Sequence, residues 1–148
     1  MIRLRFSTQV WAIDSALIRW RTQCAQSHVE FEREDGSTLG ARFPDGVLER
    51  PKSANVHQSR IVHATFPEID KAHDWVLKNL LGAPYNWKGI IGIALARDYE
   101  LKGAVDCSQT VALGAWYGCN TQLLNPTVIA WWKQTPRDLL LSTQLTVL

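Results

Sequence analysis

One short segment, Val105-Asp106-Cys107-Ser108, carries the strongest signal in this chain and marks the start of a helix. Asp106 is of the residue type that caps helix N-termini, so Cys107 falls in the first turn. The helix dipole and the unpaired backbone N–H groups there favour a thiolate, and we expect them to lower the pKa of Cys107. The same N–H groups could hydrogen-bond an oxyanion on a substrate carbonyl. The pattern is also compatible with a buried cysteine that only packs at a helix start.

A thiolate nucleophile needs a basic partner, and all four histidines of the chain precede Cys107. His28 opens a segment with strand alternation, and a rigid strand is a suitable mount for a catalytic imidazole. His57 and His63 are spaced to share one face of a strand. His73 lies on a predicted helix among charged neighbours, where we expect it to be solvated. Each histidine, taken alone, is compatible with a structural role.

The segment 82–89, Gly-Ala-Pro-Tyr-Asn-Trp-Lys-Gly, precedes the cysteine block. Together the two blocks resemble the pattern around the nucleophile of the NlpC superfamily of papain-like cysteine hydrolases. In that family a Gly-x-Pro-Tyr-x-Trp-Gly stretch comes before an Asp-Cys-Ser helix start. Here Lys88 is inserted before Gly89, and no histidine follows Cys107, whereas the catalytic histidine of the usual members follows the cysteine.

The order of the blocks is instead similar to that of a circularly permuted branch. Ser27-His28-Val29-Glu30, followed by an Asp-Gly turn at 35–36 and a Gly-Ala pair at 40–41, resembles the histidine strand of that branch. The branch includes the YiiX-type hydrolases and the lecithin:retinol acyltransferase relatives. The resemblance spans roughly residues 28–139.

The resemblance implies a papain-like, permuted NlpC-type α+β fold, in which an antiparallel sheet packs against helices and the nucleophile stands at a helix N-terminus. It assigns Cys107 as the nucleophile and His28 as the general base. Tyr85 matches a family tyrosine near the nucleophile, whose hydroxyl could donate to the oxyanion or hold Cys107. A core aromatic residue is the alternative for Tyr85.

One part of the family pattern is missing from this sequence. The third polar residue of the family usually precedes an alanine on the strand after the histidine strand, and Gly40 occupies that position here. A glycine has no side chain with which to orient an imidazole. A backbone carbonyl, a water molecule, Glu30 or Thr38 could take that role, or the register of the comparison is shifted by a residue or two.

Hydrophobic periodicity predicts one α+β domain over residues 1–148, because the strands cluster instead of alternating with helices. Ser7 and Thr8 are candidate caps of the first helix, and Gly118 is the expected end of the cysteine helix. The expected strands are 2–6 (an edge strand), 27–32, 37–43, 47–48 and 56–66. The expected helices are 10–23, one from Pro67 to Gly82, and 107–117. The segment 85–97 is mixed, with a helical apolar run, and we expect a helical turn over 126–132 and a turn at 135–138.

Composition and charge exclude some classes of binding partner and cofactor. The net charge of +2 and the lack of a basic run argue against nucleic acid. The apolar segment 90–96 is too short to cross a bilayer, and the charged N-terminal residues do not form a signal peptide. We therefore expect a cytoplasmic location, with phage lysis or specialised secretion as possible routes out. Cys24, Cys107 and Cys119 have neither disulfide nor zinc-site spacing, so no metal or cofactor is expected.

The resulting prediction is a cysteine hydrolase that cleaves an amide (peptide) or ester bond through a Cys107 acyl-enzyme, with His28 as general base. The resemblance allows cell-wall peptides, other amides and lipid acyl groups as substrates. Two alternatives stay open: a thiol acyltransferase that uses the same pair of residues, and a catalytically inactive binding module on the same fold.

Overall fold

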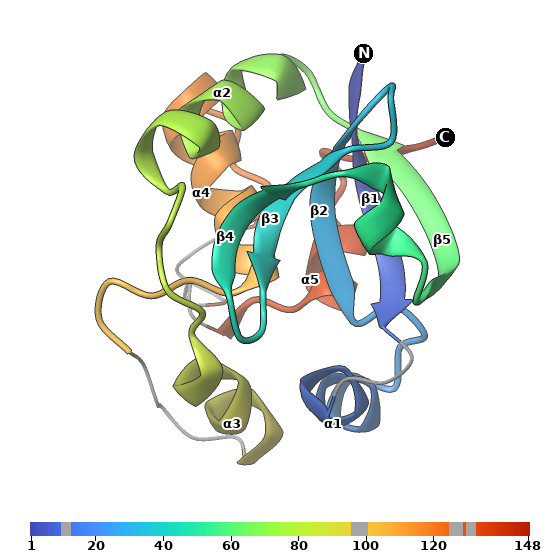
Figure 1. Ribbon diagram of the computed structural model, residues 1–148, viewed down its shortest axis with the longest axis vertical. Helices are drawn as coiled ribbons and strands as arrows, with labels where there is room; N and C mark the ends of the chain where they lie inside the picture. The colour runs from blue at the N-terminus through green and yellow to red at the C-terminus, as the bar shows by residue number, and fades with distance from the viewer. Residues whose placement is uncertain (10–12, 96–100, 125–128, 130–132) are drawn as a thin grey trace.

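The computed structural model describes residues 1–9, 13–95, 101–124, 129 and 133–148. It is an α+β fold in which helices pack against a six-stranded antiparallel sheet with the strand order β4-β3-β2-β1-β5-β6 (Figure 1). The strands are β1 Ile2–Gln9, β2 His28–Arg33, β3 Thr38–Arg42, β4 Gly46–Arg50, β5 Gln58–Thr65 and β6 Thr146–Val147. The helices are α1 Ile13–Thr22, α2 Ile69–Asn79, α3 Trp87–Leu95, α4 Cys107–Cys119 and α5 Pro136–Leu140, with a 3-10 turn at Lys52–Asn55. The α+β prediction is thus confirmed.

The first strand lies inside the sheet, and its predicted place at an edge is wrong. β1 pairs with β2 on one side and with β5 on the other. Its basic residues are used inside the sheet, because Arg3 and Arg5 both bond the buried carboxylate of Glu32 on β2. The strand also continues through Ser7 and Thr8, which are buried in it and do not cap α1.

The two faces of the β1–β2 pair have opposite character. Leu4 and Phe6 pair with Phe31 and Val29, and all four side chains are fully buried in the core. Since cross-strand partners share a face, the alternate residues point to the other side of the sheet. These alternate residues are Arg3, Arg5 and Ser7 on β1 and His28, Glu30 and Glu32 on β2.

Helix α4 lies against the core face of the sheet and beside α2. A Cβ at Gly114 would lie 2.7 Å from Val76 Cγ2, and one at Gly118 would lie 2.7 Å from Ala72 Cα. These two glycines therefore permit close helix packing. Gly118 does not end the helix as predicted, because α4 continues to Cys119 and takes its left-handed cap at Asn120, with φ of 54°.

The C-terminal part of the chain differs from the prediction in one place. Residues 135–138 begin helix α5, where Thr135 is the N-cap and Asp138 completes a capping box. The helical turn predicted over 126–132 lies mostly outside the described residues. In the described part of the chain, no helix is both long and apolar enough to cross a membrane.

Candidate active site

The N-terminus of α4 is closed by a reciprocal cap that holds Cys107 in the first helical turn. Asp106 Oδ1 accepts the backbone N–H of Gln109 at 2.9 Å, and Gln109 Oε1 accepts the backbone N–H of Asp106 at 2.9 Å. The placement of Cys107 at a helix start is therefore confirmed. The residue is only 1% exposed, and no cysteine of the chain forms a disulfide.

The loop before α3 is tied to this cap through Asn86, which is fully buried. Asn86 Nδ2 donates to Gln109 Oε1 at 3.3 Å, and Asn86 Oδ1 accepts the backbone N–H groups of Gly89 at 3.0 Å and Leu101 at 3.2 Å. A Cβ at Gly89 would lie 2.5 Å from Asn86 Nδ2, which explains why a glycine stands there. The resemblance to the family stretch includes Gly89, but the sequence alone does not show that this glycine leaves space for Asn86.

Tyr85 lies close to the cysteine helix through its backbone. It forms an isolated parallel bridge with Val105, two residues before Cys107. Its ring is 4% exposed and meets Phe43 edge-on, with 5.8 Å between the ring centroids. The role of the Tyr85 hydroxyl in catalysis stays a prediction.

The carboxyl of Asp106, next to Cys107, has an unusual pKa. Burial raises the pKa of its carboxyl to about 7, although the N–H groups of Gln109 and Ser108 act in the opposite direction. Below that pH the carboxyl is mainly neutral. It therefore does not repel a thiolate at Cys107, which a permanently ionised carboxylate in the same buried place would do.

His28 begins β2 and faces a buried carboxylate. Its Nε2 lies 3.2 Å from Glu30 Oε1, and the two residues are 4% and 0% exposed. Arg42 donates two hydrogen bonds to the same carboxylate, from Nε to Oε1 at 2.8 Å and from a terminal nitrogen to Oε2 at 2.6 Å. Burial alone would raise the pKa of Glu30, but contact with His28 and Arg42 outweighs it and holds the pKa well below the ordinary value.

Gly40 makes room for Glu30. A Cβ at Gly40 would lie 2.9 Å from Glu30 Cγ and 3.2 Å from its Cβ, so the Glu30 side chain occupies the space above the glycine. Gly40 on β3 has no polar side chain, and the Glu30 side chain from the neighbouring strand β2 fills its place. Among the alternatives left open by the sequence, Glu30 is the one in contact with His28, whereas Thr38 accepts a bond from Arg42 at 3.3 Å.

His28 and Cys107 lie at the same end of two elements that run alongside each other. A Cβ at Gly114 would be 3.3 Å from Phe31 Cζ, so these two residues are level along α4 and β2. Cys107 lies seven residues before Gly114 on the helix, and His28 lies three residues before Phe31 on the strand. Each of these segments spans about 10 Å. Both elements start near α1, because Ser15 of α1 bonds Ser27 and Ile18 of α1 lines the same crevice as Cys107.

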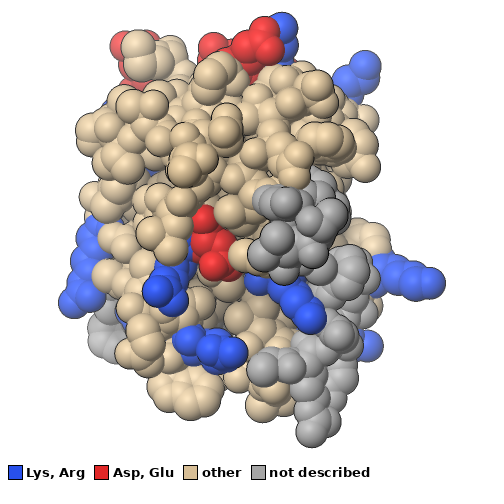
Figure 2. All heavy atoms as spheres, turned by 180° about the vertical axis from the view of Figure 1, so that it is seen from behind, with Lys and Arg blue, Asp and Glu red and all other residues tan. Residues whose placement is uncertain are grey.

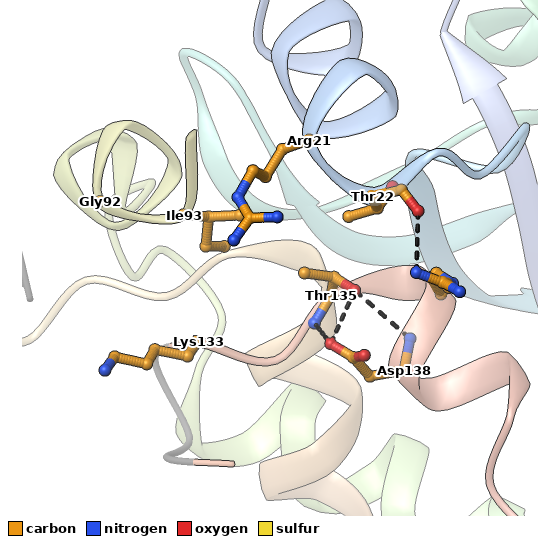
Figure 3. A pocket seen from close by; sticks show the side chains of 8 residues that line it. Arg21, Thr22, Gly92, Ile93, Lys133, Thr135 and Asp138 are labelled. Carbon is orange, nitrogen blue, oxygen red and sulfur yellow. Dashed lines mark hydrogen bonds between the residues drawn. The ribbon is translucent and has the colours of Figure 1, made fainter. Parts of the chain in front are cut away.

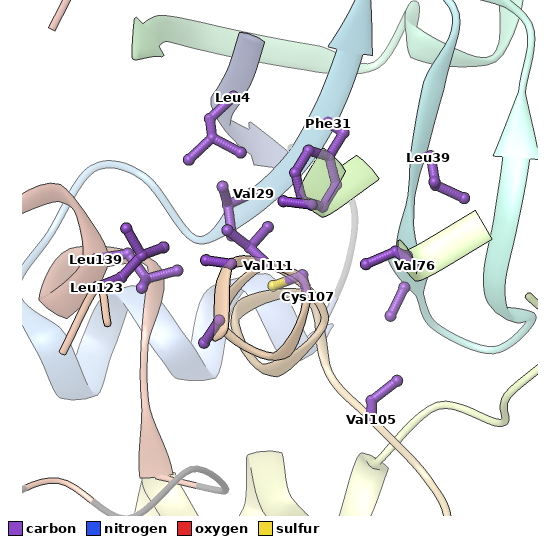
Figure 4. Packing of buried hydrophobic residues seen from close by; sticks show 14 of the residues in the cluster. Leu4, Val29, Phe31, Leu39, Val76, Val105, Cys107, Val111, Leu123 and Leu139 are labelled. Carbon is purple, nitrogen blue, oxygen red and sulfur yellow. The ribbon is translucent and has the colours of Figure 1, made fainter. Parts of the chain in front are cut away.

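The side chains of Cys107 and His28 nevertheless lie on opposite faces of the sheet. Cys107 belongs to the core cluster with Val29 and Phe31, and its side chain lies on the side of α4 that faces β2 (Figure 4). His28 alternates with Val29 and turns toward Glu30. The structure therefore brings the starts of β2 and α4 level, and it directs the imidazole to the carboxylate.

The other histidines have other surroundings. The prediction of a solvated His73 is wrong: it is 2% exposed and meets Phe31 edge-on at 5.9 Å, because α2 turns this face toward the sheet. His63 Nε2 contacts Glu32 Oε2 at 2.9 Å. His57 is exposed and precedes β5, so it does not share a strand face with His63.

A crevice too narrow for a water molecule meets the start of α4. It is lined by Ile18, Ile90, Ile93, Asp106, Cys107, Ser108, Gln134, Thr135 and Pro136. Ile93 and Thr135 also line a wider pocket of about 330 Å³, together with Arg21, Lys133 and Arg137 (Figure 3). Seen from behind, Lys and Arg side chains gather on the half of the molecule that contains α1 and α3 (Figure 2). The wider pocket therefore adjoins the crevice at Ile93 and Thr135.

No protein-family model matches the chain, and no curated protein matches its sequence. A solved structure does match: the crystal structure of metalloprotein yiiX from Escherichia coli O157:H7, DUF1105, with a TM-score of 0.69. The chain has a yiiX-like fold. The match covers 99% of this chain and 94% of yiiX at 17% sequence identity, so it establishes the fold alone.

The raised pKa of Asp106 predicts how stability depends on pH. Between the ordinary value of 3.8 and about 7 the folded protein binds more protons than the unfolded chain, so the free energy of unfolding falls as pH rises through this window. Asp106→Asn keeps a capping side chain and removes the titration. Urea denaturation near pH 5 and pH 8 should show a loss of stability in the wild type, of a few kcal/mol at most, that is much smaller in the variant.

Asp106→Ala serves as the control for the cap itself. It should also lose the pH dependence and, in addition, destabilise the protein relative to Asp106→Asn by about 1 kcal/mol at both pH values. Equal pH dependence in the wild type and in Asp106→Asn would contradict the assignment.

The Glu30 side chain fills the space beside Gly40, so we predict that substitutions at the two positions have non-additive effects on stability. Gly40→Glu should destabilise the protein by overpacking against Glu30, and Glu30→Gly should do so by leaving Arg42 without its carboxylate. In the double variant the new carboxylate enters the vacated space, so its loss of stability should be smaller than the sum of the single losses by more than about 1 kcal/mol. Additive losses in urea denaturation would show that the positions do not share this space.

Proposed function

We propose that this protein is a cysteine hydrolase that cleaves an amide, peptide or ester bond through a thioester on Cys107, with His28 as general base. The observation that carries the proposal is the capped N-terminus of α4, which places Cys107 in the first helical turn and in the lining of the crevice. A helix N-terminus stabilises both a thiolate and an oxyanion. One structural element therefore supplies two requirements of acyl transfer.

The reaction begins when His28 takes the thiol proton and the Cys107 sulfur attacks the carbonyl carbon of the substrate. A carbon–sulfur bond forms, and the carbonyl electron pair moves to the oxygen, where N–H groups of α4 stabilise it. The oxyanion collapses as the leaving amine or alcohol departs with the proton from His28. Water then hydrolyses the thioester by the same steps.

Glu30 acts in this scheme as the group that positions His28. Its carboxylate contacts Nε2, so Nδ1 is the ring nitrogen that takes the thiol proton. Arg42 fixes the carboxylate from the far side and keeps it ionised. A buried and paired carboxylate cannot rotate freely, which favours one orientation and one tautomer of the imidazole.

The proposal includes no step through a metal ion, although yiiX is described as a metalloprotein. In the ranges that the structure describes, no group of three or more His, Cys, Asp and Glu side chains could hold a metal. The two buried carboxylates on β2 are bound by arginines: Glu30 by Arg42, and Glu32 by Arg3 and Arg5. These residues do not fit a metal centre.

A binding module is the second candidate, because two observations favour it. Cys107 is 1% exposed, and the His28 side chain starts from the sheet face opposite the cysteine. Catalysis requires the imidazole to reach around the start of β2 and the crevice to open for the substrate. Covalent capture of a substrate by Cys107 separates the hydrolase from the binding module.

We predict that a small activated ester such as p-nitrophenyl acetate acetylates Cys107 at neutral pH. Intact-mass measurement after short incubation, followed by peptide mapping, should place the acetyl group on residue 107. Cys107→Ser should abolish the adduct, and His28→Ala should slow its formation by about 10²–10⁴-fold, as expected for loss of a general base.

Cys119→Ser is the matched control, because Cys119 ends the same helix and is more exposed than Cys107. It should be acetylated at the wild-type rate. An adduct confined to Cys24 or Cys119, or none at all, would contradict the hydrolase proposal and favour the binding module. Release of the acetyl group to an added amine faster than to water would instead identify an acyltransferase.

A further inference from the structure

We propose that the side-chain amide of Gln134 donates a hydrogen bond to the oxyanion that forms when Cys107 attacks a substrate carbonyl. This inference rests on the proposed hydrolase function and adds a catalytic residue to it. Gln134 is fully buried and lines the same narrow crevice as Cys107 and Ser108. It was not among the candidate site residues in the sequence.

Within the described part of the chain, the buried amide of Gln134 has no hydrogen-bond partner. Neither its Nε2 nor its Oε1 has one, whereas the equally buried amide of Asn86 uses both its nitrogen and its oxygen. A buried polar atom without a partner costs about 1–3 kcal/mol, and nearly all such atoms in folded proteins are bonded. An exception beside a nucleophile is explained if a substrate supplies the partner.

The position of Gln134 is fixed by the start of α5. The next residue, Thr135, caps this helix: its hydroxyl and backbone N–H both donate to Asp138 Oδ2, at 2.7 and 2.9 Å. Pro136 follows as the first helical residue. The crevice is too narrow for a water molecule, so ordered water does not satisfy the amide there. The amide is thus dry in the closed crevice, and it meets a substrate oxygen once the crevice opens.

The chemical role follows from the balance of the first step. As the carbon–sulfur bond forms, the carbonyl electron pair moves to the oxygen, which becomes an anion. Gln134 Nε2–H and an N–H of α4 donate to that oxygen, and neither gives up its proton. Because the bond is stronger to the oxyanion than to the ground-state carbonyl, it lowers the barrier. Loss of one such donor typically slows the reaction by about 10²–10³-fold.

Two reactions of the same sulfur test this inference. Acetylation by p-nitrophenyl acetate passes through an oxyanion, whereas alkylation by iodoacetamide displaces iodide and forms none. Gln134→Leu removes the amide and leaves a side chain of similar size, and Gln134→Met provides a second variant if the first folds poorly. We expect acetylation of Cys107 to fall by about 10²–10³-fold while alkylation stays within a few-fold of the wild type.

Gln122→Leu, at an exposed glutamine, should change neither rate. Equal losses in acetylation and alkylation for both Gln134 variants would overturn the inference, because they would indicate damage to the site. Wild-type acetylation in Gln134→Leu would also overturn it while leaving the hydrolase proposal intact. Failure of the wild type itself to be acetylated would instead overturn the hydrolase proposal.

Discussion

The reciprocal cap between Asp106 and Gln109 is the interaction on which the candidate site depends. It closes the N-terminus of α4 inside the protein, where the first N–H groups would otherwise need water. Through Asn86 it also joins the loop before α3 to the helix. Burial of the cap has two consequences for Cys107. It places Cys107 and Ser108 in the lining of the crevice, and it keeps the adjacent carboxyl neutral at mildly acidic pH.

A second constraint acts on the other face of the sheet, where charges are buried. Glu30 has no exposed surface, and a carboxylate in such a place is tolerated only if it is paired and hydrogen-bonded. Arg42 and His28 supply the partners, and Gly40 supplies the space. The cap of α4 and the buried carboxylate with its partner His28 both lie where β2 and α4 begin. In the proposed reaction, Cys107 lies on the core face of the sheet and His28 and Glu30 on the other face, so the two sides meet at the start of β2.

Much of this arrangement could be predicted from the sequence because it depends on local signals. Strand alternation identified β2 and its hairpin, and an aspartate before an apolar run identified the start of α4. The rest depends on contacts between distant segments. Gly118 permits the approach of α2, a role that its position near a helix end does not reveal. Glu30 fills the space above Gly40 only because β2 and β3 pair, and Gln134 lines the crevice of Cys107 although the two lie 27 positions apart in the sequence.

The central proposal is that the start of α4 and His28 together lower the pKa of Cys107, so that the thiol gives up its proton to His28 near neutral pH. The most direct measurement is the ultraviolet absorbance of the thiolate followed against pH, as the difference between the wild type and Cys107→Ser. The account predicts a transition at least one pH unit below the ordinary cysteine value of about 8.5, which moves upward in His28→Ala. A transition at or above that value, unchanged in His28→Ala, would contradict it.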